Sequence, residues 1–143
     1  MVEMIRRALV AGCLVATLPM GCGTTEAGDG GTEPAATELT IEVRAEEGAV
    51  PSRYELACDP PRGNLPDPDA ACEALARDGA RAFAPTPGDV ACTLIYGGPQ
   101  LAHVRGTVGG LPVDATFSRQ NGCEIDRWDR LRDVVPLPPA STG

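Results

Sequence analysis

Four cysteines downstream of residue 57 restrict the fold of this chain more than any other feature: Cys58, Cys72, Cys92 and Cys123. If all four are oxidised they form two disulfides, and three pairings are open. Sequential pairing would close the loops 58–72 and 92–123, and each closure would stabilise the domain by about 3–4 kcal/mol. A domain of about a hundred residues buries only a moderate fraction of its surface, so two such links would matter to its stability.

The N-terminal segment has the features of an export signal. Arg6 and Arg7 are followed by an apolar run, Ala8 to Gly21, that is too short to span a bilayer, and Cys22 comes next. A small residue directly before a cysteine at the end of such a run is typical of a bacterial lipoprotein cleavage site. We therefore expect a lipoprotein-type signal peptide over residues 1–21, a lipid on Cys22, and an exported chain that is either a cell-envelope lipoprotein or secreted.

Two alternatives stay open for this segment. Cys13 also follows a glycine, but the apolar run between Arg7 and Cys13 is very short for an export signal. An ordinary signal peptide cleaved nearby would remove Cys22 altogether. In each case the chain leaves the cytoplasm, and this favours disulfides among the remaining four cysteines.

Composition divides the rest of the chain into three parts. Residues 22–37 are rich in Gly, Thr, Glu and Pro and predict a flexible linker that would hold a domain off a membrane. A folded domain is expected over residues 38–136. The stretch from Val134 onward is rich in proline and predicts no regular structure, so residues 137–143 are expected to form an unstructured tail.

Charge and residue counts exclude several classes of function. The net charge of −8 argues against nucleic-acid binding, which needs a basic face. The single histidine, His103, argues against a catalytic triad or a metal site, and no convincing pair of catalytic carboxylates is present. We therefore expect a protein that is not an enzyme and that needs no metal or cofactor.

The pattern of apolar residues predicts an α+β domain. Residues 39–44 and 53–58 alternate between apolar and polar, as do residues 101–108 and 111–118, which Gly109-Gly110 would join as a hairpin. Residues 59–66 are rich in Pro and Gly and predict a loop. All the connections suit antiparallel pairing, with helices packed on one face of the sheet.

Two short helices are expected between and after these strands. Asp67 is an expected N-cap before Pro68, and Gly79 is expected to end the first helix. Asn121 and Glu124 resemble a capping box at the start of the second helix. Asn121 also lies beside Cys123, and we expect its side chain to cap the helix, to hydrogen-bond the backbone of the Cys92 segment, or to do both.

The segment Cys92-Thr93-Leu94-Ile95-Tyr96 places an apolar peptide bond of the kind that proteases cleave two residues after a cysteine. A protease would cut slowly at a bond held in a rigid, covalently tethered segment, and a slow substrate acts as an inhibitor. Residues 90–96 are equally compatible with a buried strand, so the segment alone leaves both interpretations open.

Several motifs together resemble the Streptomyces subtilisin inhibitor family, over roughly residues 39–128. These motifs are Cys58-Asp59-Pro60, Asn64-Leu65-Pro66-Asp67-Pro68, Ala71-Cys72-Glu73-Ala74-Leu75, Cys92-Thr93-Leu94-Ile95-Tyr96, Phe117-Ser118 and Asn121-Gly122-Cys123-Glu124. The resemblance implies a five-stranded antiparallel sheet with two helices on one face. It also implies the two disulfides Cys58–Cys72 and Cys92–Cys123.

For function, the resemblance implies a substrate-like reactive loop with its scissile bond between Leu94 and Ile95. The contact residues would be Ala91, Cys92, Thr93 and Tyr96. The expected partner is a subtilisin-like or chymotrypsin-like serine protease. A homodimer is a further alternative, although the charged residues expected on the outer sheet face argue against a hydrophobic dimer interface.

The chain departs from the family pattern at three places near this bond. Thr93 stands where the family commonly has proline, Gly97-Gly98-Pro99 replaces an Asp-Pro pair, and Arg119-Gln120 are two extra residues before Asn121. The first two changes are expected to loosen the loop. The second functional hypothesis is therefore an envelope-tethered binding or structural domain that keeps the scaffold without inhibition.

Overall fold

The computed structural model describes residues 35–138. The expected signal peptide, Cys13, Cys22, most of the linker and residues 139–143 lie outside the described residues. The elements are β1 (Glu38–Arg44), β2 (Ser52–Ala57), β3 (Arg62–Gly63), α1 (Pro68–Asp78), the 3-10 helix η1 (Gly79–Phe83), β4 (Leu101–Val108), β5 (Leu111–Phe117) and α2 (Gly122–Arg130).

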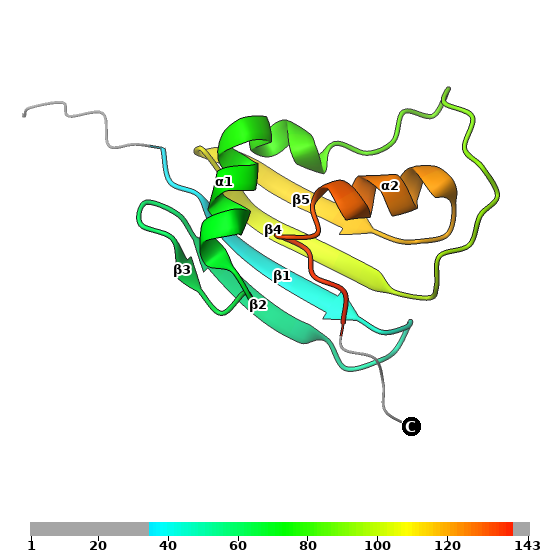
Figure 1. Cartoon of the computed structure of the whole chain (residues 1–143), viewed down its shortest axis with the longest axis horizontal. Helices are drawn as coiled ribbons and strands as arrows, with labels where there is room; N and C mark the ends of the chain where they lie inside the picture. Colours follow the sequence, from blue (N-terminus) through cyan, green and yellow to red (C-terminus); the bar gives the residue numbers. More distant parts are fainter. Residues whose placement is uncertain (1–34, 139–143) are drawn as a thin grey trace, which may run out of the picture. The chain divides into compact units, whose positions relative to one another are not determined.

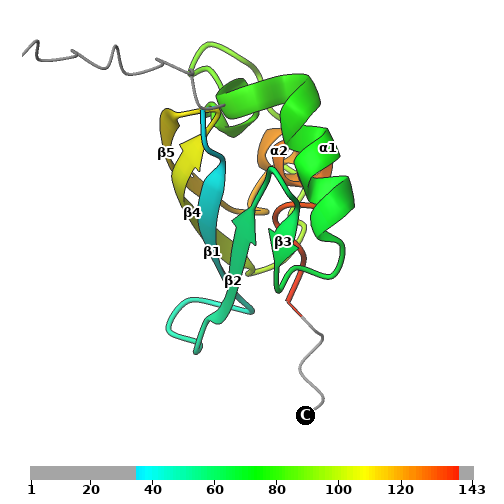
Figure 2. The same cartoon turned by 90° about the vertical axis from the view of Figure 1, so that its left-hand side faces the viewer.

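The strands form one antiparallel sheet in the order β3-β2-β1-β4-β5, with both α-helices on the same face (Figure 1). This confirms the predicted α+β fold. Figure 2 shows the sheet from its edge, with α1 and α2 on one side and no helix of residues 35–138 on the other. Leu39, Ile41 and Val43 of β1 alternate toward the helices and are buried, as their spacing predicted.

The β4–β5 hairpin turns at Gly109-Gly110, as expected. Val108 pairs with Leu111, so the turn consists of Gly109 and Gly110 alone. Both have positive φ, 56° for Gly109 and 76° for Gly110. L-residues with side chains adopt this conformation only at a cost, so the two glycines fix the register of the hairpin.

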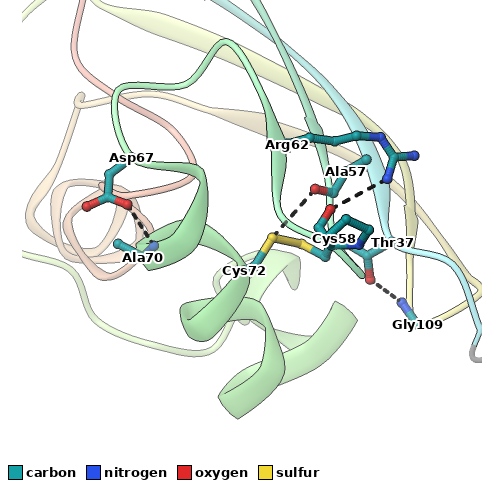
Figure 3. Close-up of a disulfide and its surroundings, with 9 residues drawn as sticks. Thr37, Ala57, Cys58, Arg62, Asp67, Ala70, Cys72 and Gly109 are labelled. Atoms are coloured by element: carbon teal, nitrogen blue, oxygen red, sulfur yellow. Dashed lines mark hydrogen bonds between the residues drawn. A yellow bond between two sulfur atoms is a disulfide. The ribbon is translucent and has the colours of Figure 1, made fainter.

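Helix α1 begins and ends where its capping residues predicted. The Asp67 carboxylate accepts a hydrogen bond of 3.0 Å from the Ala70 N–H. The Cys58–Cys72 disulfide joins the end of β2 to this helix, with the two Cα atoms 5.7 Å apart (Figure 3). Beside it, the Thr37 hydroxyl accepts a hydrogen bond from the Gly109 N–H. The first described residues are thus held against the β4–β5 turn.

The stretch after α2 completes the core. Val134 and Val135 have no exposed surface, and the Trp128 indole donates a hydrogen bond of 2.8 Å to the Val135 carbonyl. Trp128 is itself fully buried. As expected, residues 134–138 contain no helix or strand, but the two valines pack as core residues.

Strand β3 lies within residues 59–66, which the composition predicted to be a loop. Its neighbour Asn64 extends the pairing with its side chain: Oδ1 accepts a hydrogen bond from the Glu55 N–H, and Nδ2 donates one to the Arg53 carbonyl. A side-chain amide can replace a backbone partner in this way because it carries both a donor and an acceptor. Neither the composition nor the periodicity of the segment indicates such a strand.

Among the helices of residues 35–138, none is both long enough and apolar enough to span a bilayer.

Candidate functional site

Residues 84–100, which we call the exposed loop, connect η1 to β4 without helix or strand (Figure 1). The loop carries the most exposed leucine of the described chain: Leu94 is 98% exposed, while Ile95 is 60% and Tyr96 64% exposed. The alternative of a buried strand over residues 90–96 is therefore wrong. Three consecutive apolar side chains in water are unusual unless they contact a partner.

The N-terminal side of the Leu94–Ile95 bond is fixed to α2 by a disulfide. Cys92 bonds to Cys123, the second residue of the helix, with their Cα atoms 5.4 Å apart. Both disulfides that the resemblance implied are thus present. Cys92 is half-buried, whereas Ala91 and Thr93 on either side of it are exposed.

A backbone hydrogen bond reinforces this attachment. The Gly122 N–H, at the first turn of α2, donates to the Thr93 carbonyl over 3.0 Å. The N–H groups of a first helical turn have no partner within the helix, so they are free to bind a loop. A Cβ atom at Gly122 would overlap the Thr93 hydroxyl, so only glycine admits this contact without a shift.

Asn121 caps α2 as predicted, because its side chain accepts a hydrogen bond of 3.0 Å from the Glu124 N–H. A hydrogen bond from the Asn121 side chain to the exposed loop is not among those of the described residues. The backbone N–H of Gly122 occupies that role. Of the two roles left open for Asn121, the structure shows the helix cap.

The C-terminal side of the bond is held by Arg119. The Gly97 N–H donates to the Arg119 carbonyl over 2.8 Å, and the Arg119 Nε donates back to the Gly97 carbonyl over 3.4 Å. A Cβ atom at Gly97 would lie only 2.8 Å from the side chain of Ile125. Two of the departures from the family pattern therefore contact each other, and the loop is anchored where looseness was expected.

A buried arginine fixes the start of the exposed loop, and the sequence analysis missed it. Arg127 of α2 donates hydrogen bonds to the carbonyls of Phe83 (2.9 Å), Ala84 (2.8 Å) and Thr116 (2.8 Å), and pairs with Glu124 at 3.1 Å. The only sequence signal was the i, i+3 spacing of Glu124 and Arg127, which is common on solvated helix faces.

The remaining polar clusters do not extend the site. On the face of the sheet opposite the helices, the His103 Nε2 lies 2.7 Å from the Asp114 carboxylate. Within residues 35–138, no three His, Cys, Asp or Glu side chains gather as metal ligands do. The candidate site is therefore the exposed loop together with the scaffold groups that hold it.

These features define a class: small, disulfide-linked α+β domains that present one exposed loop on a rigid scaffold. Within that class, the chain belongs to the subtilisin inhibitor-like family, whose model matches residues 33–121. The matched range contains all five strands, α1 and the whole exposed loop. A comparison with curated proteins finds no match.

Proposed function

We propose that this protein inhibits serine proteases in the manner of a substrate, with Leu94–Ile95 as the scissile bond. The observation that carries the proposal is the contrast between Leu94, 98% exposed, and its neighbours Thr93 and Gly97, whose backbones are hydrogen-bonded to the scaffold. The Leu94 side chain is free to enter a pocket while the backbone around it is already ordered. Membership of the subtilisin inhibitor-like family supports the same partner class.

In the proposed reaction, the serine oxygen of the protease attacks the carbonyl carbon of Leu94 as its proton passes to the histidine base. The bond to the Ile95 nitrogen breaks, the histidine gives that nitrogen the proton, and an acyl-enzyme ester forms. Water would convert the ester to the Leu94 carboxylate and free serine. Attack by the Ile95 amine instead restores the peptide bond and also frees the serine.

The rigidity of the exposed loop determines whether the acyl-enzyme is hydrolysed or the peptide bond is restored. A flexible substrate loses conformational entropy when it binds, but a loop ordered beforehand avoids most of that cost, so the complex is tighter. The Cys92–Cys123 disulfide keeps the acyl side of the broken bond on the scaffold. Because Cys123 lies on the other fragment, the disulfide also keeps both new chain ends in one molecule, and religation can compete with hydrolysis.

The side chain at the bond sets the class of protease. Leu94 is apolar and suits the apolar specificity pockets of subtilisin-like and chymotrypsin-like enzymes. It offers no cation to the acidic pocket of a trypsin-like enzyme. We therefore infer that the target is an extracytoplasmic protease that cleaves after medium-sized apolar residues.

The test is a titration of active subtilisin and of chymotrypsin with the purified domain, residues 35–143. An inhibitor blocks the protease stoichiometrically and remains largely intact by mass spectrometry. Leu94→Gly should weaken inhibition, whereas Leu137→Gly, the same change at an exposed leucine outside the loop, should not. Rapid cleavage at Leu94–Ile95 without inhibition would favour the tethered binding or structural domain instead.

We also propose that the protein acts at the cell envelope, with the lipid on Cys22 as its anchor. The support is the basic and apolar segment before Gly21-Cys22 together with two disulfides, which persist in oxidising compartments. Cys22→Ala should move the protein from the membrane fraction to the medium. A wild-type mature N-terminus beyond Cys22 would show that the chain is secreted without an anchor.

A further inference from the structure

The scaffold holds the two sides of the Leu94–Ile95 bond by different means. On the acyl side, Cys92 is two residues from Leu94 and is covalently linked to α2. On the amine side, no covalent link lies within the exposed loop after Ile95. The first backbone hydrogen bonds there belong to Gly97, two residues beyond Ile95. After cleavage, the position of the Ile95 amine would depend on how firmly Gly97 is held.

Arg119 is the residue that holds Gly97. Its carbonyl accepts a hydrogen bond from the Gly97 N–H (2.8 Å), and its Nε donates to the Gly97 carbonyl (3.4 Å). One residue thus satisfies both backbone groups of the loop residue. The first of these bonds joins two backbone groups and the second comes from the side chain, so both parts of Arg119 hold the loop.

The Arg119 side chain is itself held at two further points. Its guanidinium pairs with the Asp129 carboxylate of α2 at 2.9 Å, and its Cζ lies 5.9 Å from the centre of the Trp128 ring. Trp128 is fully buried, and the Arg119 side chain is only 14% exposed. A guanidinium above an aromatic ring and beside a carboxylate is attracted by both. Arg119 therefore connects the loop to the hydrophobic core.

We propose that Arg119 is a positioning residue that keeps the amine side of the broken bond in place for religation. Together with the Cys92–Cys123 disulfide it forms a two-sided clamp, covalent on the acyl side and hydrogen-bonded on the amine side. The proposal rests on the proposed inhibitory function. It assigns Arg119 to the partition between religation and hydrolysis and not to the initial binding of the protease.

The experiment compares the wild type with Arg119→Met, which keeps an unbranched apolar side chain but removes the guanidinium. Arg130→Met is the matched control, because Arg130 is a solvent-exposed arginine whose ion pair within residues 35–138 is with Asp126. Asp129→Asn is a second test variant. It leaves Arg119 in place but removes its carboxylate, and Asp129 is exposed enough for the fold to tolerate the change.

Two measurements are made on each variant. The first is amide hydrogen exchange of Tyr96, Gly97 and Gly98 in the free domain, which needs no protease. The second is the ratio of cleaved to intact protein at the Leu94–Ile95 bond after prolonged incubation with subtilisin. One reaction starts from intact protein and the other from cleaved protein, and both should reach the same ratio. The association rate constant and the melting temperature are recorded beside them.

For Arg119→Met we expect exchange at Gly97 and the cleaved-to-intact ratio each to rise about three- to tenfold. The variant loses the two guanidinium hydrogen bonds, to the Gly97 carbonyl and to Asp129, and this loosens the backbone bond between residue 119 and the Gly97 N–H. Asp129→Asn should shift both in the same direction by less. The association rate constant should not change, and Arg130→Met should match the wild type in every measurement.

Values for Arg119→Met and Asp129→Asn equal to those of Arg130→Met would overturn the proposal. If Arg119→Met does not fold, the comparison of Asp129→Asn with Arg130→Met decides. If the wild type fails to inhibit subtilisin, the proposed function is wrong. The exchange measurement then still shows whether Arg119 orders the loop, and unchanged exchange would reject that role independently.

Discussion

The carbonyl oxygen of Thr93 accepts a hydrogen bond of 3.0 Å from the backbone N–H of Gly122, the first residue of α2. The Thr93 hydroxyl occupies the space where a side chain at position 122 would begin. The loop residue before Leu94 and the helix start are therefore fitted to each other. Glycine is required at position 122 because of the loop and not because of the helix, in which alanine is more favourable.

This fit predicts the outcome of a pair of substitutions. Gly122→Ala should displace Thr93 and weaken inhibition of subtilisin by about tenfold or more, since misplacing a loop by a fraction of an ångström disturbs every contact around the scissile bond. In the Thr93→Ala background the obstructing hydroxyl is gone, so adding Gly122→Ala should have little further effect. Inhibition constants from a double-mutant cycle measure the coupling, and strictly additive effects would contradict the predicted contact.

Leu94 should determine specificity. Leu94→Arg should convert a poor trypsin inhibitor into a good one while subtilisin inhibition falls, because only the side chain in the specificity pocket changes. Leu94→Met should alter subtilisin binding by no more than roughly 1–3 kcal/mol, whereas Leu94→Gly should lose more. Inhibition constants against the two enzymes provide the measurement. If they do not respond to Leu94, the scissile bond lies elsewhere.

The two disulfides should differ in what they support. The double variant Cys92→Ser/Cys123→Ser should lose inhibition while circular dichroism still shows a folded domain. The double variant Cys58→Ser/Cys72→Ser should lose a comparable stability, about 3–4 kcal/mol in the chain-entropy model, yet its folded fraction should still inhibit. Equal effects of both variants on inhibition and on stability would argue against a specific role for the Cys92–Cys123 link.

Arg127 should be essential for stability. Arg127→Met would leave the carbonyls of Phe83, Ala84 and Thr116 without their donor. We expect a loss of about 3–5 kcal/mol in the free energy of unfolding, typical of breaking a buried polar network. Urea denaturation measures it. Arg130→Met should lie within about 0.5 kcal/mol of the wild type, and a similarly small loss for Arg127→Met would contradict the prediction.

Glu42 should make stability depend on pH. A hydrogen bond from Arg53 is the largest cause that holds the pKa of Glu42 below its ordinary value. The charges of Arg53, Arg105 and Arg44 add to it and burial opposes it. Because the folded pKa is lower than the unfolded one, this stabilisation is complete above the unfolded pKa, roughly 4.3, and is lost as the pH falls through the folded pKa.

Glu42→Gln tests this dependence. The variant should be less stable than the wild type near neutral pH, and the difference should shrink as the pH falls below about 4. Urea unfolding at a series of pH values provides the measurement, with Glu73→Gln on the exposed face of α1 as the control. A difference that stays constant with pH would show that the Glu42 carboxylate is not stabilised by its arginine neighbours.

The sheet and the helices could largely be predicted because their signals are local. Alternating residues such as Leu39, Ile41 and Val43 mark a strand, and Asp67 and Asn121 mark helix starts, whatever the rest of the chain does. Strand β3 and the buried Val134 and Val135 could not be predicted in this way. Their structure is decided by partners far away in the sequence, which no local pattern reveals.

The exposed loop, too, could be predicted only where its signal is local. The cysteine two residues before Leu94 predicted a tethered, apolar segment. The support on the other side was not predicted, because Gly97 and Arg119 are separate features of the sequence: Gly97 suggested a looser loop, and Arg119 was noted only as one of two extra residues. Only the folded structure brings them together as hydrogen-bond partners.

The antiparallel pairing of β1 with β4 also determines where the exposed loop lies relative to the start of the domain. Arg44 pairs with Leu101, which directly follows the exposed loop, whereas Glu38 pairs with Thr107 at the other end of the strands. The six residue steps between these pairs span about 20 Å. The chain thus enters β1 at the end of the strand opposite to the one where the exposed loop enters β4 (Figure 1). In the lipid-anchored form that we propose, the chain would be tethered from that end, and the exposed loop would remain open to a protease.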